Sequence, residues 1–543
     1  MIAVLEHLLI VPILAPLVIG AVQLFLTEHR LVRVACALGS VLVQAAAALT
    51  LLYLTTDSMP HMWTEGVGVY ALGSWPAPFG IVLVVDRLAA LMLVLTSMVG
   101  LAALVYSLAY WDRVAPAFHS LFQFLLMGLN GAFLTGDLFN LFVFFEVLLA
   151  SSYGLLLHGS GVGRVKASLH YIVVNLVASL LFLIGVAMIY GMTGTLNMAD
   201  LAGRIVLLGA EDRALFETGA AILGVAFLIK AAAWPLNFWL PATYTAANSP
   251  TGAVFSLMTK VGVYAVLRVG TLLAAGSEQT SFIDVGLFYG GAATIAYAVV
   301  GMLASHQLGR IVSYCVVAST GLVFMALGLR IDALTAPVML YLASSILATS
   351  AFFMVNGLAQ RTRTLRVREA ADLGPLPDDT YSGFGVERQE DRLSPRDEIG
   401  VAIPAAMAFL GLTFVCCALL VAGLPPLSGF LAKFALLHTA IEQAGADTSW
   451  YTWSFCAAVL ISGVVTIVAL TRVGLRLFWS VVGRTAPRLR IIEAAPPAFL
   501  ILLCLALTAG AGPVMSYLQS AAQSLHSPQV YIRVVQGTRL VAP

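Results

Sequence analysis

The chain has 543 residues, of which 60% are hydrophobic and only 10% are charged, whereas an ordinary soluble domain carries about 25% charged residues. This composition excludes a soluble globular protein and indicates that the lipid bilayer is the main solvent. The formal net charge of +1 excludes the strongly basic balance typical of nucleic-acid-binding proteins. No Gly-rich phosphate loop, Cys-x-x-Cys pair or His-rich spacing occurs, so we expect no cofactor and no bound metal.

Fourteen apolar runs are long enough to form membrane-spanning helices, since about 20 apolar residues are needed to cross roughly 30 Å of hydrocarbon. In chain order, these runs are 8-26, 31-54, 88-110, 117-136, 138-158, 169-192, 215-240, 253-275, 283-304, 311-329, 335-359, 400-440, 453-480 and 496-519. The flank of the first run holds Glu6 and His7 without Lys or Arg, which is typical of a helix and not of a signal peptide. The sequence therefore predicts an all-α integral membrane protein of about fourteen transmembrane helices.

The basic residues of the loops predict the orientation of the chain, because cytoplasmic loops collect Lys and Arg. The odd-numbered loops hold 18 of the 28 basic residues, and the even-numbered loops hold four. We therefore expect both termini to lie on the non-cytoplasmic side. The longest polar segment, 360-399, contains seven arginines and nine acidic residues. We expect it to be a cytoplasmic loop, either a solvated connector or a docking surface for a neighbouring subunit.

Only four of the basic residues are lysines, and three of these lie inside apolar runs: Lys230, Lys260 and Lys433. A desolvated lysine can release its proton, whereas arginine stays charged. One charge at the bilayer centre costs about 2.5–3.5 kcal/mol on insertion scales, so several retained charges indicate a function. The three lysines are candidates for a proton relay.

Glu146 in the fifth run lies far from any loop, and an acid at this depth is expected to have a partner. We expect this partner to be Lys230 in the seventh run. Contact between the two would favour the charged lysine, and loss of contact would favour proton release. The alternative is a static buried ion pair. His170 at the start of the sixth run and His306 at the end of the ninth either extend a water-lined path or face lipid headgroups.

Two of the predicted helices contain helix-breaking residues, and broken helices at corresponding positions in two halves indicate a transport site. The segment Pro235–Leu240 aligns with Pro426–Leu431, 191 residues further along the chain. Six aligned positions are weak by themselves, but they suggest an internal duplication. The predicted organisation is three helices in 1-112, a first repeat in 113-276, a second repeat in 277-484, and a last helix with a tail in 485-543.

Longer motifs surround these residues. The most specific are Gly131–Glu146, His170–Leu176, Tyr190–Leu201, Met258–Tyr264 and Gly423–Phe430. Together they resemble the antiporter-like subunits shared by Mrp-type cation/proton antiporters and respiratory complex I, and most closely the D subunits of the Mrp antiporters. The resemblance extends along nearly the whole chain.

The resemblance implies two inverted five-helix repeats, each with a half-channel around a broken helix, joined by a polar axis at mid-membrane. It implies that Glu146 modulates Lys230, that Lys260 connects to the centre and that Lys433 serves the second half-channel. It also implies a multi-pass protein of the bacterial inner membrane that works in a hetero-oligomeric Mrp-type complex. The resemblance implies that this complex exchanges protons for Na⁺ or another monovalent cation, and that the chain is a transporter subunit and not an enzyme.

Three places depart from the pattern that the resemblance leads us to expect, and one of them is Gly309, which precedes Arg310 where a second basic residue is usual. Asn237 stands where relatives often have His or Tyr, and Ser344-Ser345 stands where they often have His. Asn237 and Ser344 therefore join the two histidines as candidate relay residues, and the path from Lys260 to Lys433 stays open.

The competing interpretation is a proton-pumping membrane subunit of an NADH or ferredoxin dehydrogenase or of a membrane-bound hydrogenase. Such a subunit would use the same lysines but would draw energy from redox partners. A scaffold that only holds an assembly together would leave the lysines unexplained.

Overall fold

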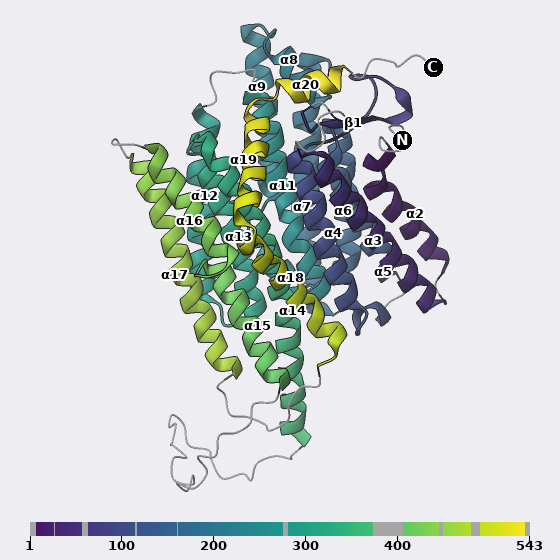
Figure 1. Ribbon diagram of the computed structural model, residues 1–543, viewed down its shortest axis with the longest axis vertical. Helices are drawn as coiled ribbons and strands as arrows, with labels where there is room; N and C mark the ends of the chain where they lie inside the picture. The colour runs from purple at the N-terminus through teal and green to yellow at the C-terminus, as the bar shows by residue number, and fades with distance from the viewer. Residues whose placement is uncertain are drawn as a thin grey trace.

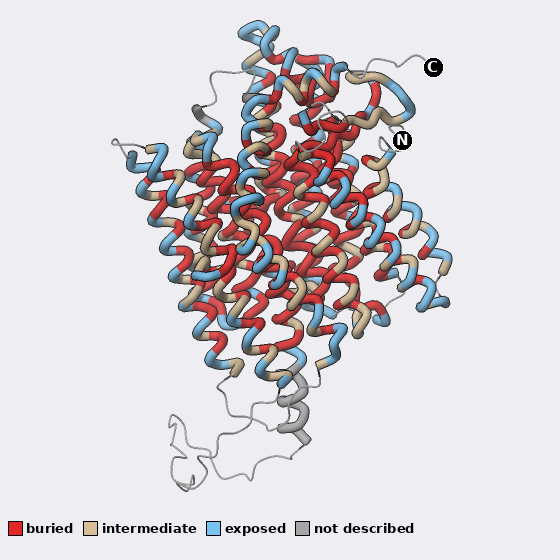
Figure 2. Tube along the Cα trace, in the orientation of Figure 1, coloured by how far each residue is buried: buried red, intermediate tan, exposed pale blue. Residues whose placement is uncertain are grey.

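The computed structural model describes residues 7–26, 28–56, 63, 65–114, 117–159, 161–274, 281–372, 405–444, 449–478 and 489–537, with the backbone alone at 274, 281–282 and 362–372. Its helices run side by side to form a thick bundle (Figure 1). Buried residues fill the centre of the bundle, and exposed residues lie on its outside and at its two ends (Figure 2).

Helices occur in each of the apolar runs expected from the sequence. In the first half of the chain they are α2 (Val11–Phe25), α3 (Arg30–Leu54), α4 (Arg87–Ser107), α5 (Phe118–Leu134), α6 (Leu138–Leu157), α7 (Val162–Thr193), α9 (Ala210–Lys230), α10 (Trp239–Ala246) and α11 (Ser249–Ala274). In the second half they are α12 (Ser281–Ala304), α13 (Leu308–Leu327), α14 (Thr335–Asp372), α15 (Ala405–Ala422), α16 (Ser428–Ala444), α17 (Trp450–Phe478), α18 (Ile491–Ala509) and α19 (Ala511–His526).

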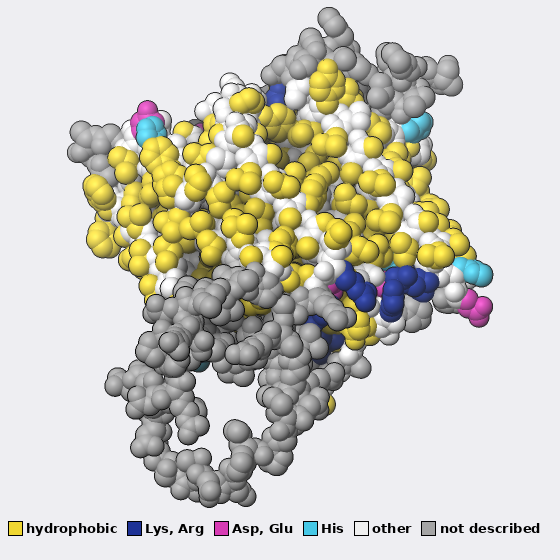
Figure 3. Space-filling model, turned by 60° about the horizontal axis from the view of Figure 1, so that its bottom comes forward, with side chains coloured by type: hydrophobic (Ala, Val, Ile, Leu, Met, Phe, Trp, Pro, Cys, Tyr) yellow, Lys and Arg dark blue, Asp and Glu magenta, His cyan; other side chains and the backbone are white. Residues whose placement is uncertain are grey.

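The described helices are those of a membrane protein. Eleven of them are long and apolar enough to cross a membrane, and α2 and α5 are shorter apolar helices. Hydrophobic side chains cover most of the face seen in Figure 3, and charged side chains gather near its edges. Soluble monomers rarely expose apolar patches beyond a few hundred Å², so this surface is suited to lipid. The chain is a multi-pass helical membrane protein.

Two features lie outside the expected membrane spans, and one of them is not helical. Strands β1 (Gly68–Ala71) and β2 (Val82–Val85) form an antiparallel hairpin between α3 and α4. Short helices α8 (Met198–Ile205) and α20 (Gln529–Gln536) lie at the same end of the bundle as β1 (Figure 1). All four elements are far shorter than the roughly 20 residues of a membrane span, so a search for apolar runs does not find them.

Helix α14 is longer than expected, because it continues to Asp372 and not to 359. The added residues include Arg, Leu, Glu and Ala, which favour helices, and the first helix-breaking residues after them are Gly374 and Pro375. The polar segment that is expected to be a loop from 360 thus begins as helix. Residues 373–399 lie outside the described part of the chain. The last expected span, 496-519, is also divided, because α18 ends and α19 begins around Gly510.

Two helices are interrupted where the sequence contains proline. The first interruption covers 231–238, between α9 and α10, and the second covers 423–427, between α15 and α16. Proline removes a backbone donor and does not fit a helix interior. Gly423 also has a φ of 80°, in the left-handed region that favours glycine at a helix end. Both interruptions leave backbone carbonyls without helical partners.

The first and last described segments lie at the same end of the bundle. Helix η1 (His7–Leu9) packs against β1, which lies near α20 (Figure 1). The end of α14 lies at the opposite end. Which of these two ends faces the cytoplasm stays a prediction from the loop charges.

Asp86 and Arg268 form a buried ion pair that joins α4 to α11. Asp86 is the N-cap of α4 and accepts a hydrogen bond from Ala89 N at 2.9 Å. Arg268 Nη2 donates to Asp86 Oδ1 at 2.6 Å, and the two side chains are 6% and 8% exposed. The Arg268 guanidinium carbon also lies 5.3 Å from the ring centroid of Tyr531, so the pair helps to hold α20 against the bundle.

We predict that Asp86→Ala destabilises the protein by about 3–5 kcal/mol, because Arg268 is left buried without a counter-ion. Thermal unfolding of the purified protein in detergent measures the effect. Glu217→Ala is the matched control, since Glu217 forms an exposed pair with Arg213, and such pairs contribute about 0.3–0.5 kcal/mol. Equal melting temperatures of the two variants would contradict this role of Asp86.

Candidate functional site

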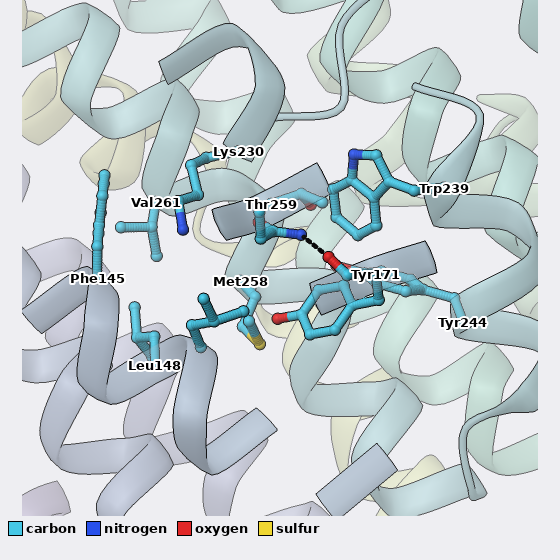
Figure 4. Close-up of a pocket in the computed structure, with 11 residues that line it drawn as sticks. Phe145, Leu148, Tyr171, Lys230, Trp239, Tyr244, Met258, Thr259 and Val261 are labelled. Atoms are coloured by element: carbon cyan, nitrogen blue, oxygen red, sulfur yellow. Dashed lines mark hydrogen bonds between the residues drawn. The ribbon is translucent and has the colours of Figure 1, made fainter. Parts of the chain in front are cut away.

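Lys230 is the last residue of α9 and directly precedes the first interruption. Its Nζ lies 5.6 Å from the ring centroid of Phe145 on α6. The side chain borders a cavity of about 30 Å³ that is lined by residues of α6, α7, α10 and α11 (Figure 4). Because one buried water needs about 10–15 Å³ of cavity volume, the cavity has room for about two water molecules next to the Lys230 amine.

Glu146 lies next to Phe145 on α6 but does not contact Lys230. Its carboxylate accepts a hydrogen bond from Ser179 Oγ on α7, and among the described residues no acid forms an ion pair with Lys230 within 4.0 Å. Successive helix residues point about 100° apart, so Phe145 and not Glu146 faces the lysine. Glu146 is still close enough to act electrostatically on Lys230. Glu146 and Lys230, which we expect from the sequence to be in direct contact, are therefore not in contact in this structure.

Lys260 lies on α11 in the centre of the bundle and is only 2% exposed. Its Nζ donates hydrogen bonds to Ser319 Oγ and, at 3.0 Å, to Thr320 Oγ1, both on α13. These hydroxyls are neutral groups that both accept and donate hydrogen bonds. Lys260 is thus solvated by side chains that are able to pass a proton onward.

Lys433 lies on α16 and is 7% exposed. Its Nζ donates to Ala422 O at 2.8 Å and to Val421 O at 3.3 Å. Both carbonyls belong to the last turn of α15, where the interruption leaves them without helical partners and where the helix dipole is negative. The broken helix itself therefore stabilises the ammonium group.

The three membrane lysines differ from Arg268 in the kind of partner they have. In the described ranges, carboxylates form ion pairs with Arg or His, and none pairs with a lysine within 4.0 Å. The contacts of the lysines are hydroxyls, carbonyls and an aromatic ring. A lysine with neutral partners can lose its proton without leaving a buried carboxylate unpaired.

Ser344 joins α14 to α16 near the second interruption. Its Oγ lies 2.8 Å from Ser428 Oγ, and Ser428 is the first residue of α16. Both serines are 1% exposed. Among the described residues, no hydrogen bond joins this pair to the hydroxyls around Lys260. The structure thus places Ser344 beside the second interruption. Within the described residues, a gap separates Ser344 from the hydroxyls around Lys260.

A second cavity, of about 740 Å³, lies at the end of the bundle where α7 and α13 begin. His170 lines it, and His170 Nδ1 lies 2.9 Å from Lys166 O. Trp239 lines both this cavity and the small cavity at Lys230. The Trp239 side chain is 3% exposed, and its Nε1 has no hydrogen-bond partner among the described residues. One indole therefore stands between the large cavity and the lysine.

The two remaining candidate relay residues are Asn237 and His306, and their positions support a relay less well. Asn237 lies in the first interruption, is 1% exposed and has an Nδ2 without a partner in the described part of the chain. It is next to Phe238, which lines the large cavity. His306 is exposed between α12 and α13 and lines neither cavity.

Sequence reasoning did not find Ser179, Ser319, Thr320 or Trp239. The first three were visible only as hydroxyl residues within apolar runs. Many other serines and threonines share that property, since their hydroxyls bond backbone carbonyls of their own helix. Which hydroxyl faces a lysine depends on how the helices pack. Trp239 was inside the motif that follows Pro235, but its position between two cavities has no signal in the sequence.

Comparison with known proteins agrees with these features. Residues 135–377 match the family model described as "NADH:quinone oxidoreductase/Mrp antiporter, TM". The chain is 48% identical to a protein of Rhizobium meliloti (strain 1021) that is named as the probable D subunit of a K⁺/H⁺ antiporter, over 98% of each chain. It is 33% identical to the D subunit of a Na⁺/H⁺ antiporter of Alkalihalophilus pseudofirmus, over 98% of this chain and 99% of the relative.

Solved structures show the same fold. A chain of the Mrp complex from Dietzia sp. DQ12-45-1b matches with a TM-score of 0.79 and 25% identity, covering 98% of this chain and 100% of that one. A chain of respiratory complex I from Thermus thermophilus matches with a TM-score of 0.70 and 22% identity, over 96% and 99% of the two chains. Both kinds of complex share the fold. The sequence identity to the two antiporter relatives, over nearly their full length, therefore assigns the family more specifically than the fold does. The chain belongs to the D-subunit family of Mrp-type cation/proton antiporters.

Proposed function

We propose that this chain is the proton-translocating subunit of a multisubunit antiporter that exchanges protons for a monovalent cation across the bacterial inner membrane. The observation that carries the proposal is the placement of Lys230, Lys260 and Lys433, which lie inside the bundle and contact neutral groups. Lysines in such surroundings bind and release protons, which arginines cannot do. The relatives named as K⁺/H⁺ and Na⁺/H⁺ antiporter subunits support the same function.

The first part of the proposed proton route joins the large cavity to Lys260. Water in the large cavity reaches Trp239, and movement of this side chain opens the small cavity at Lys230. Thr259 lines the small cavity and directly precedes Lys260 on α11. A proton on Lys230 thus passes through about two waters in the small cavity. It then follows the turn of α11 that contains Thr259 and reaches Lys260 in the centre of the bundle.

The second part of the route joins Lys260 to Lys433. It begins at the hydroxyls of Ser319 and Thr320, which already accept hydrogen bonds from Lys260. It ends at the carbonyls of α15 that hold Lys433. Water between α13 and α16 closes the gap, with Ser344 and its partner on α16 as the nearest hydroxyls on the way.

Glu146 acts as the switch of the first half. In this structure its carboxylate is held by Ser179 and Lys230 is free of it. Rotation of Glu146 toward Lys230 would favour the protonated lysine, and return to Ser179 would favour proton release. A static ion pair between Glu146 and Lys230 would not need Ser179 as a second partner for the Glu146 carboxylate.

The cation and the energy source depend on neighbouring subunits. The two antiporter relatives carry names with different cations, K⁺ and Na⁺, so we propose that the choice of cation lies at least partly in other subunits. The chain of respiratory complex I matches at 22% identity and shows the fold alone. We therefore favour an antiporter subunit over a subunit of a redox enzyme.

We also propose that the chain crosses the membrane fourteen times and contains two inverted repeats. The first, 113-276, holds α5 to α11, and the second, 277-484, holds α12 to α17. Each contains one interrupted helix with a lysine beside the interruption: Lys230 is the last residue of α9, and Lys433 on α16 donates to a carbonyl at the end of α15. Residues 1-112 and 485-543 flank the repeats.

We predict that Lys230→Arg, Lys260→Arg and Lys433→Arg each reduce exchange by about 10²-fold or more, which is the contribution of a positioned proton-transfer group. Each change keeps the charge but removes a group that can deprotonate. Cation-dependent proton movement in vesicles that contain the whole complex measures the effect. Lys166→Arg is the matched control, because Lys166 is an exposed lysine at the wall of the large cavity and not one of the proposed proton carriers, and arginine keeps its positive charge there.

Assembly of each variant is checked in the same membranes. Charge balance alone predicts that arginine retains most of the activity and alanine does not, whereas a relay predicts that both fail. Normally assembled complexes with near-wild-type exchange at all three arginine positions would overturn the relay.

We predict that a cysteine at Gln536 on α20 reacts with an impermeant thiol reagent added to intact spheroplasts, and that one at Arg113 does not. Both positions are exposed, and the loop charges place Arg113 on the cytoplasmic side. Labelling of the unmodified chain, which contains six cysteines, is subtracted. The reverse pattern would show that the orientation is inverted.

We predict that the purified chain by itself produces no cation-dependent proton movement in liposomes, whereas the assembled complex does. The reason is that its relatives are named as single subunits of larger antiporters. Fluorescent measurement of internal pH after a Na⁺ or K⁺ pulse tests both preparations side by side. Sustained exchange by the single chain would contradict the proposed division of labour.

A further inference from the structure

The large cavity carries positive charge that the proposed proton route does not use. Its lining includes Arg164, Lys166 and Arg310 but no Asp or Glu. In the described part of the chain, neither Lys166 nor Arg310 has an acidic partner within 4.0 Å. The cavity is thus a basic hollow at one end of the bundle.

Local structure directs further positive potential into this hollow. Arg164 is held in place because its Nε donates to Ala246 O at 2.9 Å and its Nη1 donates to His158 O. Helix α7 begins at the cavity, and its N-cap, Gly161, offers no side-chain acceptor to the first backbone N–H groups. The amino end of a helix carries a partial positive charge and free donors. An anionic group in the cavity would therefore meet three cationic side chains and a helix terminus.

Apolar side chains line the same cavity. Val162 is 90% exposed and Phe238 is 49% exposed, and both belong to the lining. The helices α7 and α13 begin here, so the cavity lies at the edge of the hydrophobic band. A fully water-soluble anion would leave these apolar groups uncovered, whereas a lipid would cover them with its acyl chains.

We propose that this cavity binds the headgroup of an anionic phospholipid, with the phosphate near Lys166 and Arg310 and the acyl chains along Val162 and Phe238. The cytoplasmic leaflet is rich in anionic lipids, and the charges of the loops place this end of the bundle on the cytoplasmic side. The proposal goes beyond the transport function, because the binding of lipid does not depend on whether protons pass.

A bound headgroup would also act on the proton route. Trp239 forms part of the cavity wall and borders the small cavity at Lys230. Three positive charges at this entrance repel protons and metal cations alike, and a phosphate in the cavity offsets them. This consequence rests on the proposed function, whereas the binding itself does not.

The test uses the purified complex in nanodiscs of phosphatidylcholine titrated with phosphatidylglycerol, and native mass spectrometry counts the bound lipids. We expect Lys166→Gln/Arg310→Gln to weaken phosphatidylglycerol binding by about 30-fold, the loss for two basic residues near a membrane surface. Arg113→Gln/Arg533→Gln is the matched control, since it also removes two exposed positive charges but neither residue lines the cavity.

Two further measurements separate the sources of the anion and the two proposals. Inorganic phosphate that displaces phosphatidylglycerol at millimolar concentration would overturn the lipid in favour of a soluble phosphate. Equal lipid binding by the two double variants, or no lipid in the assembled complex, would overturn the site. Exchange rates in liposomes with and without phosphatidylglycerol then test the effect on transport, and a complex that binds lipid but does not exchange ions would contradict only the proposed function.

Discussion

Burial of positive charge in an apolar bundle is the constraint on which this structure depends. A charged group inside the membrane is costly unless protein groups replace the lost water. The chain meets this requirement in two ways. Arg268 has a carboxylate partner, Asp86, and the pair holds three helices together. Lys260 and Lys433 have hydroxyls and carbonyls instead. The first solution fixes the charge permanently, and the second allows it to be gained and lost.

The interrupted helices supply much of that stabilisation. Backbone that is not helical is tolerated at membrane depth only where protein or water satisfies its polar groups. Lys433 satisfies two carbonyls at the end of α15, and Lys230 ends α9 beside a cavity with room for water. At the second interruption the exposed carbonyls need a donor and the buried lysine needs acceptors, so the broken helix and Lys433 stabilise each other.

The fold alone does not separate an antiporter from a respiratory complex. Chains of the Mrp complex and of complex I match with TM-scores of 0.79 and 0.70. A buried lysine that exchanges protons serves both kinds of machine, and the energy source belongs to the subunits around it. In our proposal, this chain contributes a set of titratable lysines in fixed positions and a basic cavity at one end of the bundle. Similarity over nearly the full length of the antiporter relatives, and not the fold, assigns the family.

The sequence by itself determined that the chain lies in a lipid bilayer. It also determined the approximate positions of the spans, the two helix interruptions and the three membrane lysines, because the length of an apolar run, a proline and an isolated charge are local properties. It did not determine the contacts of those lysines. Glu146 is expected at Lys230 but is held by Ser179, since the angular position of a residue on α6 depends on packing against α7 and α9. The hairpin of β1 and β2, the length of α14 and the place of Trp239 between two cavities were likewise decided by tertiary structure, because each depends on residues far apart in the chain or on signals shorter than a membrane span.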